Sequence, residues 1–199
     1  VREVLDAVHR ASLQWRSWPL ERRARPLREL ARLLRERSGA IAGLMAREMG
    51  KPVRQGAGEA EKCAWTCEYF ADNAAAFLKP EPVATEASSS FVTFQPLGVI
   101  LAVMPWNFPF WQVFRCAAPG VMAGNAWLLK HASGVTGSAL LIEELFREAG
   151  FPADLLRAVI LRGGPPVLEL IDDPRVAAVT LTGSGPAGRA VAERAGRNL

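Results

Sequence analysis

The feature that most constrains the fold of this chain is a repeated alternation, after Pro96, of short apolar runs with amphipathic segments. The apolar runs cover residues 99–104, 126–129, 155–161 and 176–181, and the helical patterns cover 110–123, 136–149, 166–171 and 187–195. Continuous apolar strands that alternate with helices are typical of a parallel sheet with both faces covered. Residues 97–199 are therefore predicted to form a doubly wound α/β domain.

The first part of the chain has a different pattern, in which apolar side chains recur at helical spacing. One stripe consists of Leu27, Leu30, Ala31 and Leu34, and the next consists of Ile41, Leu44 and Met45. Helix breaks are expected at Pro19, at Ser38-Gly39 and at Gly50-Lys51-Pro52, and a long helix is expected over residues 57–78. Residues 1–83 are therefore predicted to form an N-terminal helical layer.

Residues 84–96 connect these two regions. From Glu86 to Gln95 the side chains alternate as in a strand, but neither alternating set is strongly apolar. Such a strand has no face that a core would cover. We expect a strand arm that pairs with something outside the main core.

The composition limits the class of protein. With 199 residues, of which 50% are hydrophobic, the chain can bury one substantial core. No apolar stretch approaches the roughly 20 residues that span a bilayer, and the first residues lack a secretion signal pattern. Cys63, Cys67 and Cys116 are odd in number and lack metal-binding spacing. We expect a soluble, cytoplasmic protein with reduced thiols and no membrane partner.

The net charge of +4 reflects arginines that cluster between residues 16 and 37. Glu21, Glu29 and Glu36 interleave with these arginines, and no aromatic side chains alternate with them. This pattern favours a solvated helix face over a nucleic-acid surface. The sequence therefore predicts no nucleic-acid partner.

In doubly wound sheets, ligands bind beyond the carboxyl ends of the strands. The run at 99–104 is followed by Pro105-Trp106-Asn107-Phe108-Pro109, in which prolines fix the backbone around one amide side chain. Asn107 could donate hydrogen bonds to a developing oxyanion, or it could cap the following helix. The spacing alone does not separate these two roles.

The run at 126–129 is followed by Lys130-His131-Ala132-Ser133, in a chain that is poor in lysine. Lys130 is either a charge placed for a ligand or a lysine whose ammonium reaches solvent. His131 is a candidate base or ligand. The only other histidine in the chain is His9, however, so a metal site or a catalytic triad has little support.

Glycines follow the last two apolar runs. Gly163 and Gly164 allow close approach of the backbone to a ligand, but they are equally ordinary in a tight turn. Gly183-Ser184-Gly185-Pro186-Ala187-Gly188 has the spacing G-x-G-x-x-G at a strand-to-helix junction. Backbone N–H groups at the start of such a helix favour the phosphates of a dinucleotide. Against an ordinary Rossmann fingerprint, however, the motif comes only after some 180 residues, so the sheet is expected to be Rossmann-like and not an ordinary Rossmann fold.

In this order, these strings resemble the aldehyde dehydrogenase superfamily, and the resemblance spans nearly the whole chain. It is carried by Arg32 to Arg37, Glu48-Met49-Gly50-Lys51-Pro52, Glu61-Lys62-Cys63-Ala64, Pro105 to Pro109, Gly124-Asn125, Lys130, Glu148 to Pro152 and Leu181 to Ser184. The Lys-His-Ala-Ser form after the second run looks most like the bacterial succinate-semialdehyde dehydrogenase branch. The resemblance implies the NAD(P)-binding, N-terminal part of an enzyme that oxidises an aldehyde, with succinate semialdehyde as the expected substrate.

The resemblance also implies roles for the residues at the strand ends. Asn107 would be the oxyanion donor and, with Trp106, would lie at the nicotinamide end of the cofactor. The other implied cofactor residues are Lys130, His131, Ala132 and Ser133 near the adenosine ribose, Gly183 and Ser184 at the pyrophosphate, and Gly163 and Ala187 as neighbours. In this family the dinucleotide crosses the helix end differently from ordinary dehydrogenases, so Gly185 and Gly188 are not assigned.

Ser133 stands where many NAD-preferring members of the family have a glutamate, so NADP is expected to be the preferred cofactor, with NAD still usable. The nucleophilic cysteine and the general-base glutamate of the family would lie beyond Leu199, and Cys116 is expected to be a core thiol. The strand arm would join subunits into a homodimer or homotetramer.

Two other interpretations remain open. The chain could be a stand-alone nucleotide-binding module, or it could be a scaffold that serves assembly only. Gly183-Ser184 and Lys130 favour a nucleotide site over a bare scaffold. A polypeptide that stops at Leu199 is expected to have no dehydrogenase turnover, because the covalent route needs a nucleophile that it lacks.

Overall fold

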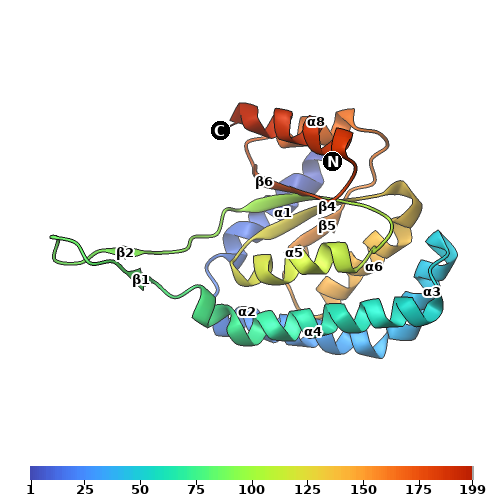
Figure 1. Cartoon of the computed structure of the whole chain (residues 1–199), viewed down its shortest axis with the longest axis horizontal. Helices are drawn as coiled ribbons and strands as arrows, with labels where there is room; N and C mark the ends of the chain where they lie inside the picture. The colour runs from blue at the N-terminus through green and yellow to red at the C-terminus, as the bar shows by residue number, and fades with distance from the viewer. Residues whose placement is uncertain (199) are drawn as a thin grey trace.

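The computed structural model describes residues 1–198, and its centre is a four-stranded parallel sheet (Figure 1). The strands are β3 (Val99–Met104), β4 (Ala126–His131), β5 (Leu156–Ala158) and β6 (Val176–Leu181). Every predicted apolar run forms a strand, so the predicted parallel α/β sheet is confirmed. β4 continues beyond its predicted end, and Lys130 and His131 therefore belong to the strand itself.

In the strand order β5-β4-β3-β6, the direction in which the chain adds strands to the sheet changes between β3 and β6. From β3 the chain moves outward to β4 and β5, and it then crosses back to form β6 on the other side of β3. A doubly wound sheet has a crevice at this switch point, because the connections after neighbouring strands run to opposite faces. The loops after β3 and β6 are therefore the ones best placed to hold a ligand.

One face of the sheet is covered by α5 (Trp111–Met122) and α6 (Thr136–Glu148), the crossover helices that follow β3 and β4. Figure 1 shows a further layer beyond them, formed by α2 (Leu20–Glu36), α3 (Ser38–Met49) and α4 (Val53–Phe77). The predicted stripe of Leu27, Leu30, Ala31 and Leu34 is fully buried between these layers. The outer helices thus support the crossover helices that begin at the carboxyl edge of the sheet.

The other face of the sheet carries α1 (Arg2–Trp15), α7 (Pro165–Ile171) and α8 (Gly185–Ala195). The helices predicted for residues 1–83 thus divide between the two faces, because α1 packs against β3, β4 and β5 and not beside α2–α4. Leu5, Val8 and Trp15 form its buried side. An amphipathic pattern shows that a helix has a buried side, but it does not show which face of a sheet that side will cover.

Two of the predicted helix breaks are observed and the third is misplaced. Pro19 is the N-cap residue of α2. Gly50 ends α3 in the left-handed conformation, with φ of 75°, which glycine adopts without steric cost. The break predicted at Ser38-Gly39 lies slightly too late in the chain, since α2 ends at Glu36 and Ser38 already begins α3. Arg37 alone links these two helices.

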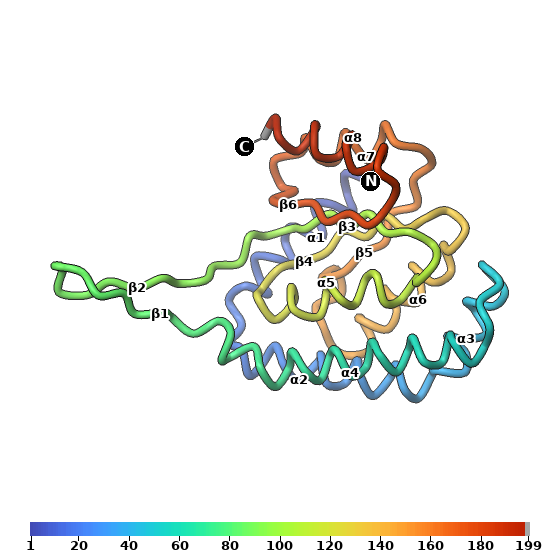
Figure 2. The backbone as a smooth tube through the Cα atoms, in the orientation of Figure 1, coloured from blue at the N-terminus to red at the C-terminus, as the bar shows by residue number. Residues whose placement is uncertain are grey.

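A two-stranded antiparallel ribbon projects from the body of the molecule (Figure 2). It is formed by β1 (Glu81–Pro82) and β2 (Phe91–Val92), and its side chains are exposed, with Phe91 at 60%. The predicted arm of residues 84–96 contains only the second of these strands, because β1 is too short to give an alternating pattern. A ribbon of this size is marginally stable by itself in water.

No helix among residues 1–198 is both long enough and apolar enough to cross a membrane.

Helix packing within the core depends on small residues where a helix closely contacts its neighbour. Gly120 of α5 is one of these, because a Cβ atom there would lie 2.3 Å from Cζ2 of Trp127 in β4.

We expect Gly120→Ala to lower the free energy of unfolding by about 1–3 kcal/mol, because the buried Trp127 ring would have to shift in a closely packed core. Urea unfolding followed by tryptophan fluorescence measures the change. The matched control is Gly58→Ala in α4, where an added Cβ meets no atom within 4 Å and the midpoint should stay the same or rise. Equal midpoints for the two variants would contradict this account of the α5–β4 contact.

Candidate functional site

Three of the predicted site segments start side by side at the carboxyl edge of the sheet. Ala132 N donates to Met104 O at 2.9 Å, which continues the pairing of β4 with β3. Thr182 N donates to Val103 O at 3.0 Å, which continues the pairing of β6 with β3. Neighbouring strands lie about 5 Å apart. The segments at 105–109, 130–133 and 182–184 therefore surround the switch point.

Asn107 lies in the irregular loop between β3 and α5. Its side chain is exposed and has no hydrogen-bond partner within the described part of the chain. Trp106 and Phe108 on either side are also exposed, at 55% and 45%. The alternative in which Asn107 caps the following helix is wrong, since no side chain of this loop caps α5. An exposed amide at the switch point is available to donate to a ligand.

A buried ion pair from the helical layer holds the start of α5. Glu59 of α4 accepts hydrogen bonds from Phe110 N and Trp111 N, both at 2.9 Å. The other oxygen of its carboxylate pairs with Lys51, whose ammonium lies 3.9 Å from the centre of the Phe108 ring. Glu59 and Lys51 are only 5% and 7% exposed. Because the first N–H groups of a helix have no partners within it, Glu59 acts as the cap of α5.

His131 holds the same loop from the sheet side. Its Nε2 donates to Pro109 O at 2.8 Å, since a carbonyl oxygen can only accept, and its Nδ1 accepts from Ala132 N at 3.0 Å. Burial lowers the pKa of His131, so the ring is neutral at physiological pH. That His131 lies near the adenosine ribose stays a prediction, but its ring nitrogens are not available to the cofactor. The ring is buried, and main-chain groups occupy both of its nitrogens.

Lys130 and Ser133 lie at and just after the carboxyl end of β4. The Lys130 side chain is half-buried and has no ion-pair partner among residues 1–198. Ser133 is exposed and begins a single 3-10 turn ahead of α6. Glu48 fixes the start of that helix, where its carboxylate accepts from Gly137 N at 2.5 Å and from Ser138 N at 3.0 Å. An unpaired ammonium and a hydroxyl at this position can bind a ribose or a phosphate.

The G-x-G-x-x-G segment begins α8, and Ser184 is its N-cap residue. Ser184 Oγ accepts from Ala187 N at 3.4 Å, a long hydrogen bond that leaves the first N–H groups of the helix weakly satisfied. A Cβ atom at Gly183, Gly185 or Gly188 would meet its nearest neighbours at ordinary distances, between 3.5 and 4.0 Å. Gly188 therefore does not have the close-packing role of the third glycine in a Rossmann motif.

Gly163 lies in the connection between β5 and α7. It follows β5, the edge strand farthest from the switch point, and its φ of 77° favours glycine in the turn before α7. The turn accounts for a glycine at this position, and its place as a neighbour of the cofactor stays a prediction.

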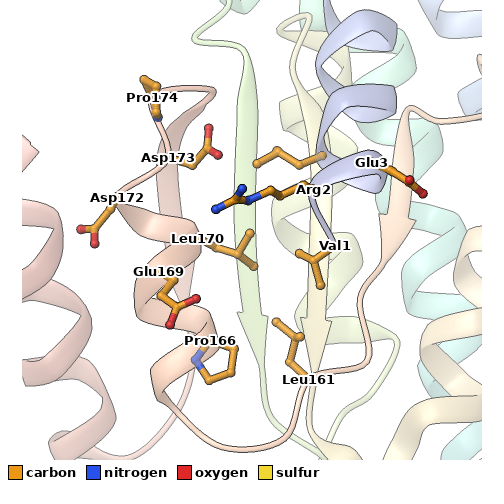
Figure 3. Close-up of a pocket in the computed structure, with 11 residues that line it drawn as sticks. Val1, Arg2, Glu3, Leu161, Pro166, Glu169, Leu170, Asp172, Asp173 and Pro174 are labelled. Carbon is orange, nitrogen blue, oxygen red and sulfur yellow. The ribbon is translucent and has the colours of Figure 1, made fainter.

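A cavity of about 680 Å³ opens between the start of α1 and α7, and it contains none of the predicted site residues (Figure 3). Two of its four acidic side chains are already paired: Asp172 with Arg194, and Asp173 with Arg175. The site residues predicted from the sequence therefore lie at the strand ends and not in this cavity.

The cysteines do not belong to the site. Cys63 and Cys67 are buried in α4, and burial raises the pKa of both thiols well above the ordinary value. Cys116 is half-buried, and its Sγ lies 3.8 Å from Thr180 Oγ1. Within residues 1–198, no group of three or more His, Cys, Asp or Glu side chains could hold a metal ion.

The two capping carboxylates, Glu48 and Glu59, and one cation were not predicted from the sequence. Glu59 could have been found as an acid on the same helix face as the apolar Ala60 and Cys63, since an unpaired charge is rarely buried. Arg115 of α5 gave no signal among many arginines. Its guanidinium is exposed and donates to Thr182 Oγ1 at 2.6 Å, at the end of β6.

The fold belongs to the doubly wound α/β class, in which the carboxyl edge beside the switch point is the usual place for a nucleotide. Residues 1–199 match the family model described as the aldehyde dehydrogenase family, and the chain belongs to that family. The resemblance inferred from the sequence is thereby confirmed.

Similar proteins of known name agree with this membership. A probable succinate-semialdehyde dehydrogenase (NADP+) of Synechocystis sp. is 49% identical over 195 residues, which are 98% of this chain and 43% of that protein. A succinate semialdehyde dehydrogenase (NAD(P)+) of Escherichia coli is 44% identical over 185 residues, or 93% and 40% of the two chains. The crystal structure of succinic semialdehyde dehydrogenase from Streptococcus pyogenes with NADP+ has a TM-score of 0.95 and 39% identity, and the match covers 99% of this chain and 43% of that chain. The chain thus spans less than half the length of these relatives.

Proposed function

We propose that the protein to which this chain belongs oxidises an aldehyde to a carboxylic acid with NADP or NAD, and that succinate semialdehyde is its substrate. The observation that carries the proposal is the unpaired Asn107 amide at the switch point, beside the start of α8. The names of the similar proteins from Synechocystis sp. and Escherichia coli support the choice of substrate.

In this proposal residues 97–199 bind the dinucleotide, residues 1–83 support them and residues 84–96 serve assembly. The weakly satisfied N–H groups at the start of α8 fit a pyrophosphate, which Gly183 and Ser184 would approach, with Ala187 nearby. The unpaired Lys130 ammonium fits an adenosine ribose or its phosphate, together with Ala132 and Ser133. Trp106 and Asn107 would lie at the nicotinamide end, and Gly163 would be a neighbour of the cofactor.

When bound, the cofactor accepts a hydride. Asn107 donates a hydrogen bond to the oxygen that gains negative charge when a thiolate attacks the aldehyde. We place that thiolate and the general-base glutamate in the part of the protein outside this chain. The burial of Cys63 and Cys67 supports this placement, because a buried thiol with a raised pKa is a poor nucleophile.

Arg115 supports a substrate with a second, anionic end. Succinate semialdehyde carries a carboxylate remote from its aldehyde group. The Arg115 guanidinium is exposed near the switch point and pairs with no carboxylate among residues 1–198. A neutral aldehyde has no anionic group with which the Arg115 guanidinium could form an ion pair.

A stand-alone nucleotide-binding module and an assembly scaffold are not favoured, because neither needs an unpaired donor at the switch point. We further propose that the projecting arm joins subunits into a homodimer or homotetramer. A cytoplasmic location is supported by the three free thiols, which a reducing compartment preserves.

The test is reduction of NADP by the whole protein with succinate semialdehyde, compared with butanal as a neutral aldehyde of the same carbon number. We expect a kcat/KM at least about tenfold higher for succinate semialdehyde, since one charge pair at an intermediate dielectric is worth a few kcal/mol. Absence of turnover with either aldehyde would reject the function. Equal kcat/KM values would reject the substrate assignment alone.

A further inference from the structure

The loop at residues 105–110 has to place the Asn107 amide without help from the Asn107 side chain itself. This side chain has no partner among the described residues, and the loop has no regular secondary structure. A donor acts on an oxyanion only when it lies within a narrow range of distances. The position of Asn107 is therefore set by whatever holds the main chain on either side of it.

On the upstream side the loop is continuous with β3, one of the two inner strands of the sheet, which ends at Met104. On the downstream side three main-chain groups in succession are held by side chains from other elements. Pro109 O accepts from His131 of β4, and Phe110 N and Trp111 N donate to Glu59 of α4. Asn107 thus lies in a short span between two fixed points.

The two anchoring side chains are themselves fixed. The Glu59 carboxylate is paired with the buried Lys51, and the ammonium of Lys51 also packs on the ring of Phe108, the residue after Asn107. The His131 ring is 5% exposed, and its Nδ1 accepts from Ala132 N. Neither anchor can turn away without leaving a buried polar group unsatisfied.

We propose that His131, with the Glu59–Lys51 pair, is a positioning residue that fixes Asn107 for donation to the oxyanion. This inference rests on the proposed function of Asn107 and adds to it the side-chain contacts that hold the amide in place. Its most testable component is His131. Variants of Glu59 would leave the Lys51 ammonium unpaired in the core, and loss of folding would then obscure any change in turnover.

The test compares His131→Gln with His131→Asn in the whole protein, by kcat and by KM for the cofactor. The longer amide of glutamine can bring its nitrogen to the place of Nε2 and donate to Pro109 O, whereas that of asparagine is too short. We expect His131→Asn to lower kcat by about 10- to 100-fold. The kcat of His131→Gln should stay within about fivefold of the parent value, which is roughly the effect of one imperfect hydrogen bond. KM for the cofactor should change little in both variants.

The same two variants are then made in an Asn107→Ala background. If His131 acts through Asn107, their kcat values become equal within about twofold, because the group to be positioned is gone. A difference between glutamine and asparagine that persists in this background would overturn the positioning role. Equal kcat values for the two variants in the parent background would overturn it as well. A parent protein without turnover would instead reject the proposed function.

Ser12→Ala is the matched control for the loss of a buried hydrogen bond. Ser12 Oγ donates to His9 O at 2.7 Å within α1, on the other face of the sheet, and Ser12 is 2% exposed. We expect this variant to lower stability without lowering kcat. A fall in kcat as large as that of His131→Asn would show that general loosening of the fold is the cause, and would overturn the inference.

Discussion

Asn107→Ala is expected to lower kcat of the whole protein by about 10²- to 10³-fold, the cost of removing one oxyanion donor. KM for the cofactor should stay nearly unchanged, because the amide acts on charge that appears only during the reaction. The Asn107 side chain is exposed and makes no hydrogen bond within residues 1–198, so its removal should leave the fold intact.

Steady-state kinetics under conditions where chemistry is rate-limiting measure this effect. The matched variant is Asn107→Asp, which keeps the size of the side chain but replaces the N–H donor with an acceptor. It should be at least as impaired as Asn107→Ala, since a carboxylate repels an oxyanion. An unchanged kcat in Asn107→Ala would reject the oxyanion role.

Ser133→Glu is expected to shift the ratio of kcat/KM for NADP to that for NAD by tenfold or more toward NAD. A 2′-phosphate carries up to two negative charges, and repulsion by a nearby carboxylate is worth on the order of a few kcal/mol at an effective dielectric near 20. The parent protein should favour NADP, because Ser133 offers a hydroxyl and Lys130 an unpaired ammonium. NAD should remain usable, since a hydroxyl can also bond to a free ribose.

The control that separates charge from size is Ser133→Gln, which has the shape of glutamate without its charge. Its cofactor ratio should stay closer to that of the parent. A parent that strongly favours NAD, or a Ser133→Glu variant with an unchanged ratio, would show that Ser133 does not face the ribose.

The strands and crossover helices were predictable because their signals are local. Burial on both faces of β3 requires a continuous apolar run, and the sequence of β3 contains one from Val99 to Met104. The switch point follows from the alternation of strands with helices, and the candidate loops follow from the switch point. For this reason the sequence alone indicates Asn107, Lys130 and Ser184 as candidate site residues.

The features that the sequence did not reveal depend on partners far away along the chain. Glu59 caps a helix that begins about 50 residues later, and His131 reaches a carbonyl 22 residues earlier. The amphipathic pattern of α1 contains no information on which face of the sheet it covers. Local patterns report burial and periodicity, but these contacts depend on how the elements are arranged in space.

The strand order also sets the order in which the sheet can be built. β3, β4 and β5 follow one another in the chain and can assemble with α5 and α6 as soon as they leave the ribosome, whereas β6 joins β3 only after a long detour. β6 and α8 contain no fully buried residue, unlike β3 and β4. We therefore expect them to dock last and open first within this chain. A dinucleotide that spans β3 and α8 would stabilise the part of the sheet that is held least firmly.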